Sequence, residues 1–448
     1  MKSYLDKAKI DYVLFHLNHH IDIDELRPFF HFIKNSEEIL NYEGKILFLL
    51  NNDVFNKKKI KAINNIPVLF PVLDRADFFY EEKGNLIFSH DILKSIFYLL
   101  SGYQELDNSN CDTHGRFQYK ESIQYKLNIT EKPIVNYYFE VIKKALKSYA
   151  KKKEIQLKDK SLFDEASFLL THDLDLIKKY TPRYVLFRLK RIIQDSKNRN
   201  EHTKEIIRTL KHLFTKPISD DPYWTYDILN QSNQGKNLPI YFILPEKGSD
   251  NSNYRLKGRY YKKFCREIIP ASSIGLHASY HAYNKGAIMQ PEKEKLEKSC
   301  GQSINSVRNH FLRYDISTTP YIHEEYFDMD FSLGFAEQIG FRNSYCHPFK
   351  LYDFKNNRMF RHWEIPLNIM DASLFVYNKF TYEQALNECQ AIANEVTKFN
   401  GLLTILWHNS FLDEDELPGI KMFYSQITKA LSNLPHVNTN TLSAMLSN

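Results

Sequence analysis

Short apolar runs that end in polar residues recur along the C-terminal two-thirds of the sequence. The runs and the residues that follow them are Ser167–Leu170 before Thr171, His172 and Asp173; Ile240–Leu244 before Pro245; Ser273–Leu276 before His277; Ile365–Met370 before Asp371; and Leu402–Trp407 before His408. Longer stretches with helical character, such as Arg188–Gln194 and Glu292–Phe311, lie between them. Strands that alternate with helices predict a parallel sheet or a β/α barrel. Because such a barrel gathers the C-terminal ends of its strands at one rim, we expect these polar residues to converge there.

The N-terminal third has a different pattern. Its strand candidates are Lys45–Leu50 and Ile66–Leu73, and a helix is expected from Asp91 to about residue 103. A lysine-rich segment then separates this part from the rest of the chain. We therefore predict an α/β protein with a smaller α/β domain over residues 1–155 and an irregular (β/α) barrel over residues 162–448.

Composition narrows the classes of function. The chain has 448 residues, of which 43% are hydrophobic and 25% charged, which is typical of a soluble globular protein. Its net charge of +6 is a mild lysine excess, so a nucleic-acid partner is not expected. The five cysteines are scattered and favour a reducing compartment. The chain shows neither an N-terminal apolar signal stretch nor a run approaching the ~20 apolar residues of a membrane span, so we expect a cytoplasmic protein without an integral membrane segment.

Two histidines have a spacing that suits a metal. His277 and His281 are four residues apart, so on a helical turn both rings would project from one face. A catalytic zinc site needs three nitrogen or oxygen ligands and an open position for water. Asp173 or Asp175, at another strand end, can supply the carboxylate.

A second histidine pair has the same spacing. His16 and His20 are also four residues apart, with His19 between them. Unlike the pair at His277, they have no partners at other predicted strand ends, so we favour His277 and His281.

The same rim offers groups for proton transfer. In an extended segment alternate residues share a face, so Asp173 and Asp175 can both point to the metal, one as ligand and one as base. His408 can serve as the acid, with Asp371 raising its pKa and orienting its ring. Arg308 can position the base through a charge-assisted hydrogen bond.

Each of these residues also has a purely structural interpretation. Asp173 can cap a helix over residues 174–180, and His408 can cap a buried strand end. Arg308 alone is more typical of a surface helix. Only the set as a whole favours catalysis.

Five segments occur in a characteristic order. They are Thr171–Asp175, His277–His281, Arg308–Arg313, Asp371 and Ile405–His408. In this order they resemble the motifs of the NodB-type polysaccharide deacetylases, carbohydrate esterase family four. The first motif takes an Asp-x-Asp form, the second lacks the hydroxyl beside its first histidine, the third keeps only its arginine, and the fourth lacks its downstream tryptophan.

The resemblance implies an irregular barrel of the deacetylase type with two groups of site residues. The implied ligands of zinc, or of another divalent transition metal, are Asp175, His277 and His281. The implied proton-transfer residues and their supports are Asp173 as base, His408 as acid, Arg308 and Asp371.

The resemblance also implies a function. We expect the removal of N- or O-linked acetyl groups from a carbohydrate or glycoconjugate precursor. The alternatives are hydrolysis of another C–N bond, such as that of a cyclic amide, and a catalytically inactive carbohydrate-binding relative. Residues 1–155 look similar to an uncharacterised domain that often precedes such deacetylases. The long segment between Asp175 and Ile240 is expected to add helices over the site.

Overall fold

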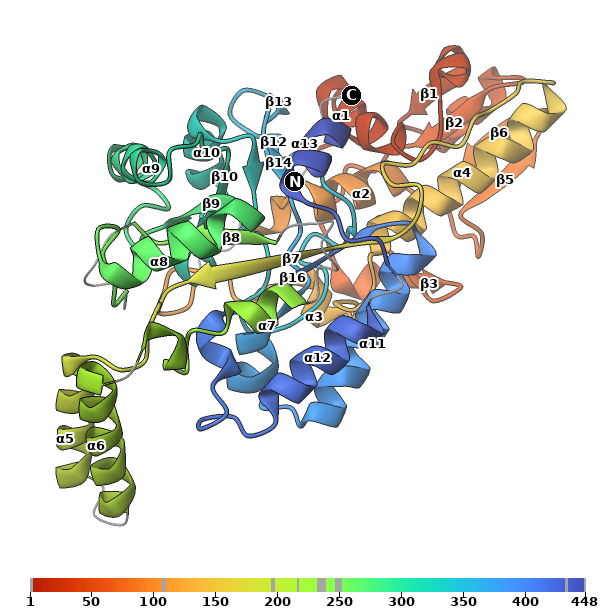
Figure 1. Ribbon diagram of the computed structural model, residues 1–448. Helices are drawn as coiled ribbons and strands as arrows, with labels where there is room; N and C mark the ends of the chain where they lie inside the picture. The colour runs from red at the N-terminus through yellow and green to blue at the C-terminus, as the bar shows by residue number, and fades with distance from the viewer. Residues whose placement is uncertain are drawn as a thin grey trace.

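Two β-sheets organise the chain (Figure 1). The computed structural model describes residues 3–106, 110–194, 198–215, 217–231, 239–245, 252–431 and 434–446. The smaller sheet belongs to the N-terminal third, and the larger one extends through the remainder of the chain.

The smaller sheet has the strand order β1-β2-β6-β5. Its strands are β1 (Phe30–Ile33), β2 (Ile46–Leu49), β5 (Phe79–Glu82) and β6 (Asn85–Phe88); the helices of this part are α1 (Lys7–Leu17), α2 (Ile92–Leu100), α3 (Ile123–Lys126) and α4 (Ile134–Lys152). The first three strands in the order run parallel, and β5 pairs antiparallel with β6. The predicted strand Lys45–Leu50 and the predicted helix from Asp91 are confirmed, whereas Ile66–Leu73 forms only the short β4 (Ile66–Val68), paired with β3 (Lys61–Ile63).

The larger sheet has eight parallel strands in the order β14-β11-β10-β9-β8-β7-β16-β15. They are β7 (Ser167–Leu174), β8 (Ile240–Ile243), β9 (Ser273–Ala278), β10 (Ser306–Asn309), β11 (Met329–Asp330), β14 (Trp363–Glu364), β15 (Ile369–Met370) and β16 (Leu402–Leu406). The sheet curls into a half-barrel, which confirms the predicted α/β class and its parallel, barrel-like sheet.

Helices connect and cover these strands. They are α5 (Pro182–Gln194), α6 (Arg199–Thr215), α7 (Tyr226–Gln231), α8 (Arg259–Glu267), α9 (Gly286–Cys300), α10 (Thr319–Tyr326), α11 (Tyr382–Lys398), α12 (Ile420–Ala430) and α13 (Thr439–Leu446); a small hairpin is formed by β12 (Tyr352–Asp353) and β13 (Arg358–Met359). None of the helices in the described residues is long and apolar enough to cross a membrane.

The predicted helix over Glu292–Phe311 is wrong in its second half. Helix α9 ends at Cys300, where Gly301 adopts a left-handed conformation with φ of 72° that stops the helix. The chain then enters β10, so Arg308 lies on a strand and not on a surface helix. The run Ile365–Met370 is also shorter than predicted as a strand, because Pro366 precedes β15 and lacks the N–H of a ladder.

The N-terminal third shares its core with part of the larger sheet's connections. Its apolar cluster includes Tyr345, Phe349 and Phe360 from the segment around β12 and β13. A buried ion pair also joins the two parts, since Arg342 donates two hydrogen bonds to Glu105, of 2.9 and 2.6 Å. These contacts pack residues 4–150 directly against the half-barrel.

Candidate active site

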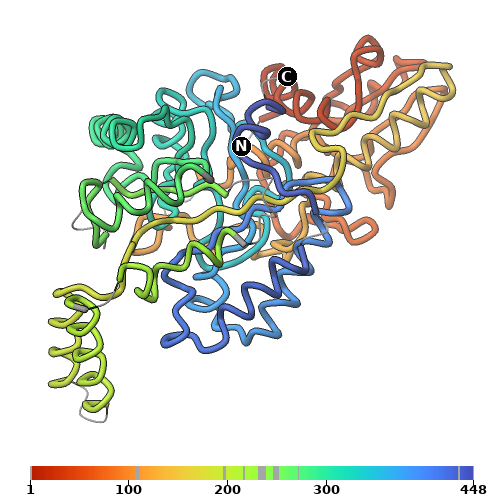
Figure 2. Tube along the Cα trace, in the orientation of Figure 1, coloured from red at the N-terminus to blue at the C-terminus, as the bar shows by residue number. Residues whose placement is uncertain are grey.

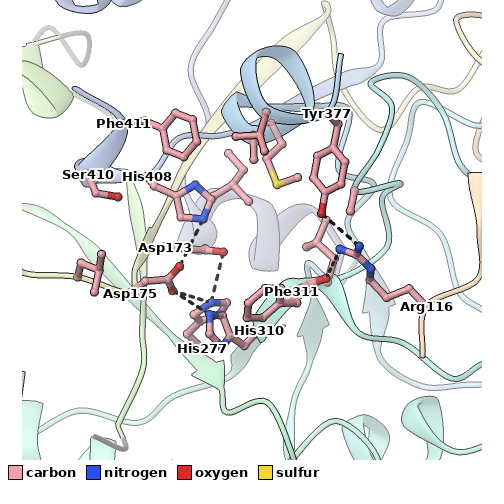
Figure 3. A pocket seen from close by; sticks show the side chains of 17 residues that line it. Arg116, Asp173, Asp175, His277, His310, Phe311, Tyr377, His408, Ser410 and Phe411 are labelled. Carbon is pink, nitrogen blue, oxygen red and sulfur yellow. Dashed lines mark hydrogen bonds and ion pairs between the residues drawn. The ribbon is translucent and has the colours of Figure 1, made fainter. Parts of the chain in front are cut away.

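Five of the predicted site residues lie at the C-terminal ends of neighbouring strands. Asp173 is near the end of β7, His277 near the end of β9 and Arg308 near the end of β10. Asp371 directly follows β15, and His408 lies two residues after β16. The predicted convergence at one rim is therefore confirmed, and Figure 3 shows the pocket of about 300 Å³ that several of these side chains line.

A buried ion pair holds Asp173, which lines this pocket. The Arg308 guanidinium is fully buried and donates a 2.7 Å hydrogen bond to Oδ1 of Asp173. It also donates to the carbonyl of Phe331 at 3.1 Å and stacks 4.4 Å from the ring of Phe242. Gly275 makes room for that ring, since a Cβ there would lie 2.4 Å from it. Asp173 is thus held in a strand by Arg308, and it caps no helix, because residues 175–181 form none.

Three side chains converge beside Asp173. Nε2 of His277 lies 3.1 Å from Oδ1 of Asp175, and Nε2 of His310 lies 3.6 Å from the same oxygen. One ligand atom from each of the three residues falls within 4.8 Å of the others. The other ring nitrogen of His277 fixes the orientation of the ring, because Nδ1 is 3.0 Å from the carbonyl oxygen of Arg308.

This donor set fits a divalent transition metal. Oδ1 of Asp175 and Nε2 of His277 are buried and have no hydrogen-bond partner, although they lie close together. Two imidazoles and one carboxylate are the ligands of many catalytic zinc sites. The hydrogen bond between His277 Nδ1 and a backbone carbonyl is the outer-shell contact expected of a metal-binding histidine.

His281 is not part of this group. The expected pairing required a helical turn from His277, but His277 lies in strand β9 and the chain then enters a turn. As a result His281 is exposed and its ring contacts that of Tyr280 at 5.1 Å between centroids. His310, which directly follows β10, occupies the third place instead.

On the opposite side of Asp175, His408 forms a pair with Asp371. Nδ1 of His408 is 2.8 Å from Oδ1 of Asp371, and the His408 backbone N–H donates to Oδ2 at 2.6 Å. Nε2 of His408 then faces the pocket, 3.7 Å from Oδ2 of Asp175. Asp371 therefore orients the ring as predicted.

Asp173 and His408 have opposite protonation states at neutral pH. Burial raises the pKa of Asp173, but the charges of Arg308, His277 and His408 outweigh it and hold that pKa below its usual value. Burial lowers the pKa of His408, but the charge and hydrogen bond of Asp371, followed by the two site aspartates, raise it to about 10. Asp173 is thus ionised and His408 protonated.

A loop of the N-terminal third also reaches the pocket. Arg116 donates to the carbonyl of Phe311 at 3.1 Å and to the hydroxyl of Tyr377 at 3.2 Å, and it pairs with Asp112. The ring of His114 stacks on Phe311 at 4.7 Å. Phe311 and the residue after it have φ angles of 62° and 53°, which are strained for residues other than glycine. The loop therefore holds the strained turn that follows His310.

Sequence reasoning missed His310, Arg116 and Tyr377. A signal for His310 was present, because it lies two residues after Arg308, as Asp175 lies two residues after Asp173. In an extended segment that spacing places both side chains on one face. Arg116 and Tyr377 carry no comparable pattern.

The remaining histidine clusters belong to the core. His16 is 2.9 Å from the Tyr12 carbonyl and accepts from the Lys350 backbone, and His20 is 2.8 Å from the Tyr345 hydroxyl. A buried group of Asp330, His362 and Glu364 has suitable donor atoms for a metal. Its members are tied to other core side chains, with Tyr314 donating to Glu364 at 2.8 Å and His323 2.5 Å from Asp330, and none of the three lines the pocket.

Comparison with known proteins gives one family match over part of the chain and several similar solved structures. Residues 4–151 match a family of unknown function, DUF7033. No curated protein matches the sequence. One similar structure is described as a polysaccharide deacetylase from Mycobacterium smegmatis; it has 13% identity and a TM-score of 0.40, and the match covers 63% of this chain and 91% of that chain. A family 4 acetyl xylan esterase from Clostridium thermocellum, in complex with a cobalt ion, has 12% identity and a TM-score of 0.30, with 62% of this chain and 90% of that chain covered. A CE4 family pseudoenzyme from Bacillus anthracis has 10% identity and a TM-score of 0.30, with 63% of this chain and 66% of that chain covered. At these identities and TM-scores they establish no shared activity.

The ligand set can be tested by a matched pair of substitutions. We expect His310→Ala to weaken zinc binding by more than about 100-fold, beyond the loss typical of an outer-shell change. His281→Ala removes an exposed ring and should leave the affinity unchanged. Competition with a chromogenic chelator measures both. Loss of zinc in the His281 variant alone would show that the group described above is not the metal site.

The N-terminal loop can be tested through the same affinity. We expect Arg116→Leu to weaken zinc binding by about tenfold, because the turn that carries His310 loses its hydrogen bond to the guanidinium. Arg266→Leu, at an exposed arginine of α8, is the control. Thermal unfolding in chelator and in zinc distinguishes a role in metal binding from a role in stability alone. If Arg116 serves stability alone, its substitution lowers the unfolding temperature equally in both conditions and leaves the zinc affinity unaltered.

Proposed function

We propose that this protein is a metal-dependent hydrolase that removes an acetyl group from a carbohydrate or glycoconjugate. One observation carries the proposal: an ionised Asp173 and a protonated His408 flank the group of Asp175, His277 and His310 within one pocket. A base, an acid and a metal site are the parts that hydrolysis of an amide or ester requires. The order of the motifs along the chain supports the acetyl-carbohydrate class.

The chain's own side chains divide the proton transfers. Asp173 accepts a proton from water as its oxygen attacks the acetyl carbon, while Arg308 holds the other carboxylate oxygen in place. His408 donates its Nε2 proton to the departing nitrogen or oxygen when the bond to the acetyl carbon breaks. The products are acetate and the free amine or alcohol. Asp371 keeps His408 protonated and fixes its ring.

The metal site adds one kind of chemistry. A divalent cation held by Asp175, His277 and His310 would lower the pKa of water and polarise the acetyl carbonyl. The outer-shell contact of His277 with the Arg308 carbonyl links that site to the base, because Arg308 also binds Asp173.

The walls of the pocket suit a small acyl group on a ring-shaped substrate. Apolar side chains of Leu312, Met370 and Leu406 line it and can surround a methyl group. The rings of Tyr377 and Phe411 line it as well, and aromatic faces pack against the C–H faces of sugars. These features support an acetylated sugar as the substrate.

The activity is tested by acetate release from a panel of N- and O-acetylated sugars, with a cyclic amide included. We expect acetate release by the zinc-loaded protein, and a fall in kcat of about 100-fold or more in Asp173→Asn, since general bases contribute at least that much. Asp77→Asn, at an exposed carboxylate, should be fully active. Zinc content should be unchanged in both variants. Hydrolysis of the cyclic amide alone, or zinc binding with no hydrolysis of any substrate, would contradict the proposal.

The pH dependence tests the role of Asp371. The pKa of His408 is raised to about 10 chiefly by Asp371, so the acid form persists well above neutrality and kcat falls only as the pH rises through that value. In Asp371→Asn the pKa should fall, and the alkaline limb of the kcat profile should move to lower pH. His408→Gln should abolish that limb. An alkaline limb that stays in place in Asp371→Asn would show that His408 is not the acid.

A further inference from the structure

Helices α5 and α6 form a hairpin that projects from the body of the protein. Figures 1 and 2 show the pair extending away from both sheets, with the two helices side by side. The hairpin is inserted between β7 and β8 and begins seven residues after Asp175. None of the described residues of α5 and α6 lines the candidate pocket, so these two helices do not lie over the site as expected. Its position instead leaves most of its surface to solvent.

Exposed apolar side chains are concentrated on the hairpin. Of the thirteen large hydrophobic side chains that are strongly exposed in the described part of the chain, seven belong to it: Leu186, Phe187, Leu189, Ile193, Ile207, Leu210 and Phe214. Ile193 and Phe214 are the most exposed, at 80% and 84%. Such a concentration marks an interaction surface, whereas single exposed apolar residues need no explanation.

The apolar side chains follow the helical repeat. On α5 they recur at Leu186, Leu189 and Ile193, and on α6 at 207, 210 and 214. Spacings of three and four residues align each set in a stripe along its helix. Neither stripe faces the partner helix, which is contacted through positions such as Tyr184 and Arg188.

The hairpin also holds the excess positive charge of the protein. Helix α5 has four basic residues and no acidic one, and α6 has four basic and two acidic residues. The two helices together carry a net charge of +6, which equals the formal net charge of the whole chain. The remainder of the molecule is therefore balanced, and the hairpin is its cationic part.

We propose that the hairpin docks on the surface of an anionic lipid bilayer. Apolar side chains would enter the boundary between headgroups and acyl chains, while arginines and lysines contact lipid phosphates. The helices are about 20 and 26 Å long and strongly charged, so they lie on a bilayer and do not span it. A second copy of the chain is a poor occupant, because pairing two hairpins brings like charges together. A nucleic acid would match the charge but would leave the apolar stripes exposed.

Docking has a consequence for the catalytic pocket. The hairpin follows the C-terminal end of β7, where Asp173 lies, so a docked hairpin would connect the bilayer to the strand end that carries this residue. Membrane attachment itself does not depend on the proposed activity, and it is measured without substrate.

The test is co-sedimentation of the full chain with vesicles of phosphatidylcholine alone and of phosphatidylcholine with phosphatidylglycerol. We expect binding to the anionic vesicles only. Reversing three charges of α5, as Arg183→Glu with Lys190→Glu and Arg191→Glu, should weaken the affinity for anionic vesicles by about 100-fold or more, because each basic residue near the surface contributes to the attraction. The matched control reverses the run Lys57, Lys58 and Lys59, which lies outside the hairpin, and should bind like the unaltered protein.

A second pair of variants tests the apolar stripes. Ile193→Ser with Phe214→Ser should weaken vesicle binding, whereas Leu40→Ser with Met422→Ser, at sites elsewhere that are 69% and 65% exposed, should not. Circular dichroism checks the helix content of each variant, and the charge variants carry the test if an apolar variant unfolds. The proposal is overturned if the protein does not bind anionic vesicles, or if both charge variants lose vesicle binding equally. It is also overturned if the hairpin variants abolish self-association or RNA binding while vesicle binding persists.

Discussion

The buried guanidinium of Arg308 is the constraint around which the candidate site is built. A charge removed from water is tolerated only with a compensating charge and additional hydrogen bonds. Asp173 supplies the charge, and the Phe331 carbonyl accepts a further hydrogen bond. The same residue orients His277 through its backbone carbonyl, and its strand ends just before His310. A single position on β10 thus holds Asp173 and orients His277, one of the three candidate ligands.

Charge pairing also explains how an ionised carboxyl group and a protonated imidazole coexist in one small pocket. Asp173 faces Arg308, which keeps the carboxyl ionised despite its burial. His408 faces Asp371, which keeps the imidazole protonated although burial lowers its pKa. Each group is stabilised by an opposite charge on the side away from the pocket. Their protonation states at neutral pH are therefore those that the proposed hydrolysis requires.

Much of this arrangement could be predicted from the pattern of strand ends. Alternation of apolar runs and helices is enough to predict a parallel sheet, and the polar residues after each run are enough to predict one shared rim. The metal ligands could not be chosen correctly from the spacing of residues in the sequence, because that spacing does not give the local backbone conformation. The interval from His277 to His281 is compatible with a helix, but β9 continues through residue 278 and carries the second histidine away. The helix expected across Arg308 failed because Gly301 ends it, a signal visible in the sequence. The catalytic roles themselves stay predictions.

The position of the third candidate ligand gives the N-terminal third a part in the site. The position of a ligand in the turn after β9, such as His281, would depend on that turn alone. The position of His310 depends instead on the strained turn at Phe311. Left-handed residues other than glycine cost about 1 kcal/mol or more each and persist only where their surroundings hold them. Here the surroundings are Arg116 and His114, which bind and stack on Phe311 from the region that matches a family of unknown function. The position of the candidate ligand His310 and the packing of this region against the half-barrel are thereby coupled, because both depend on the same few contacts around one turn.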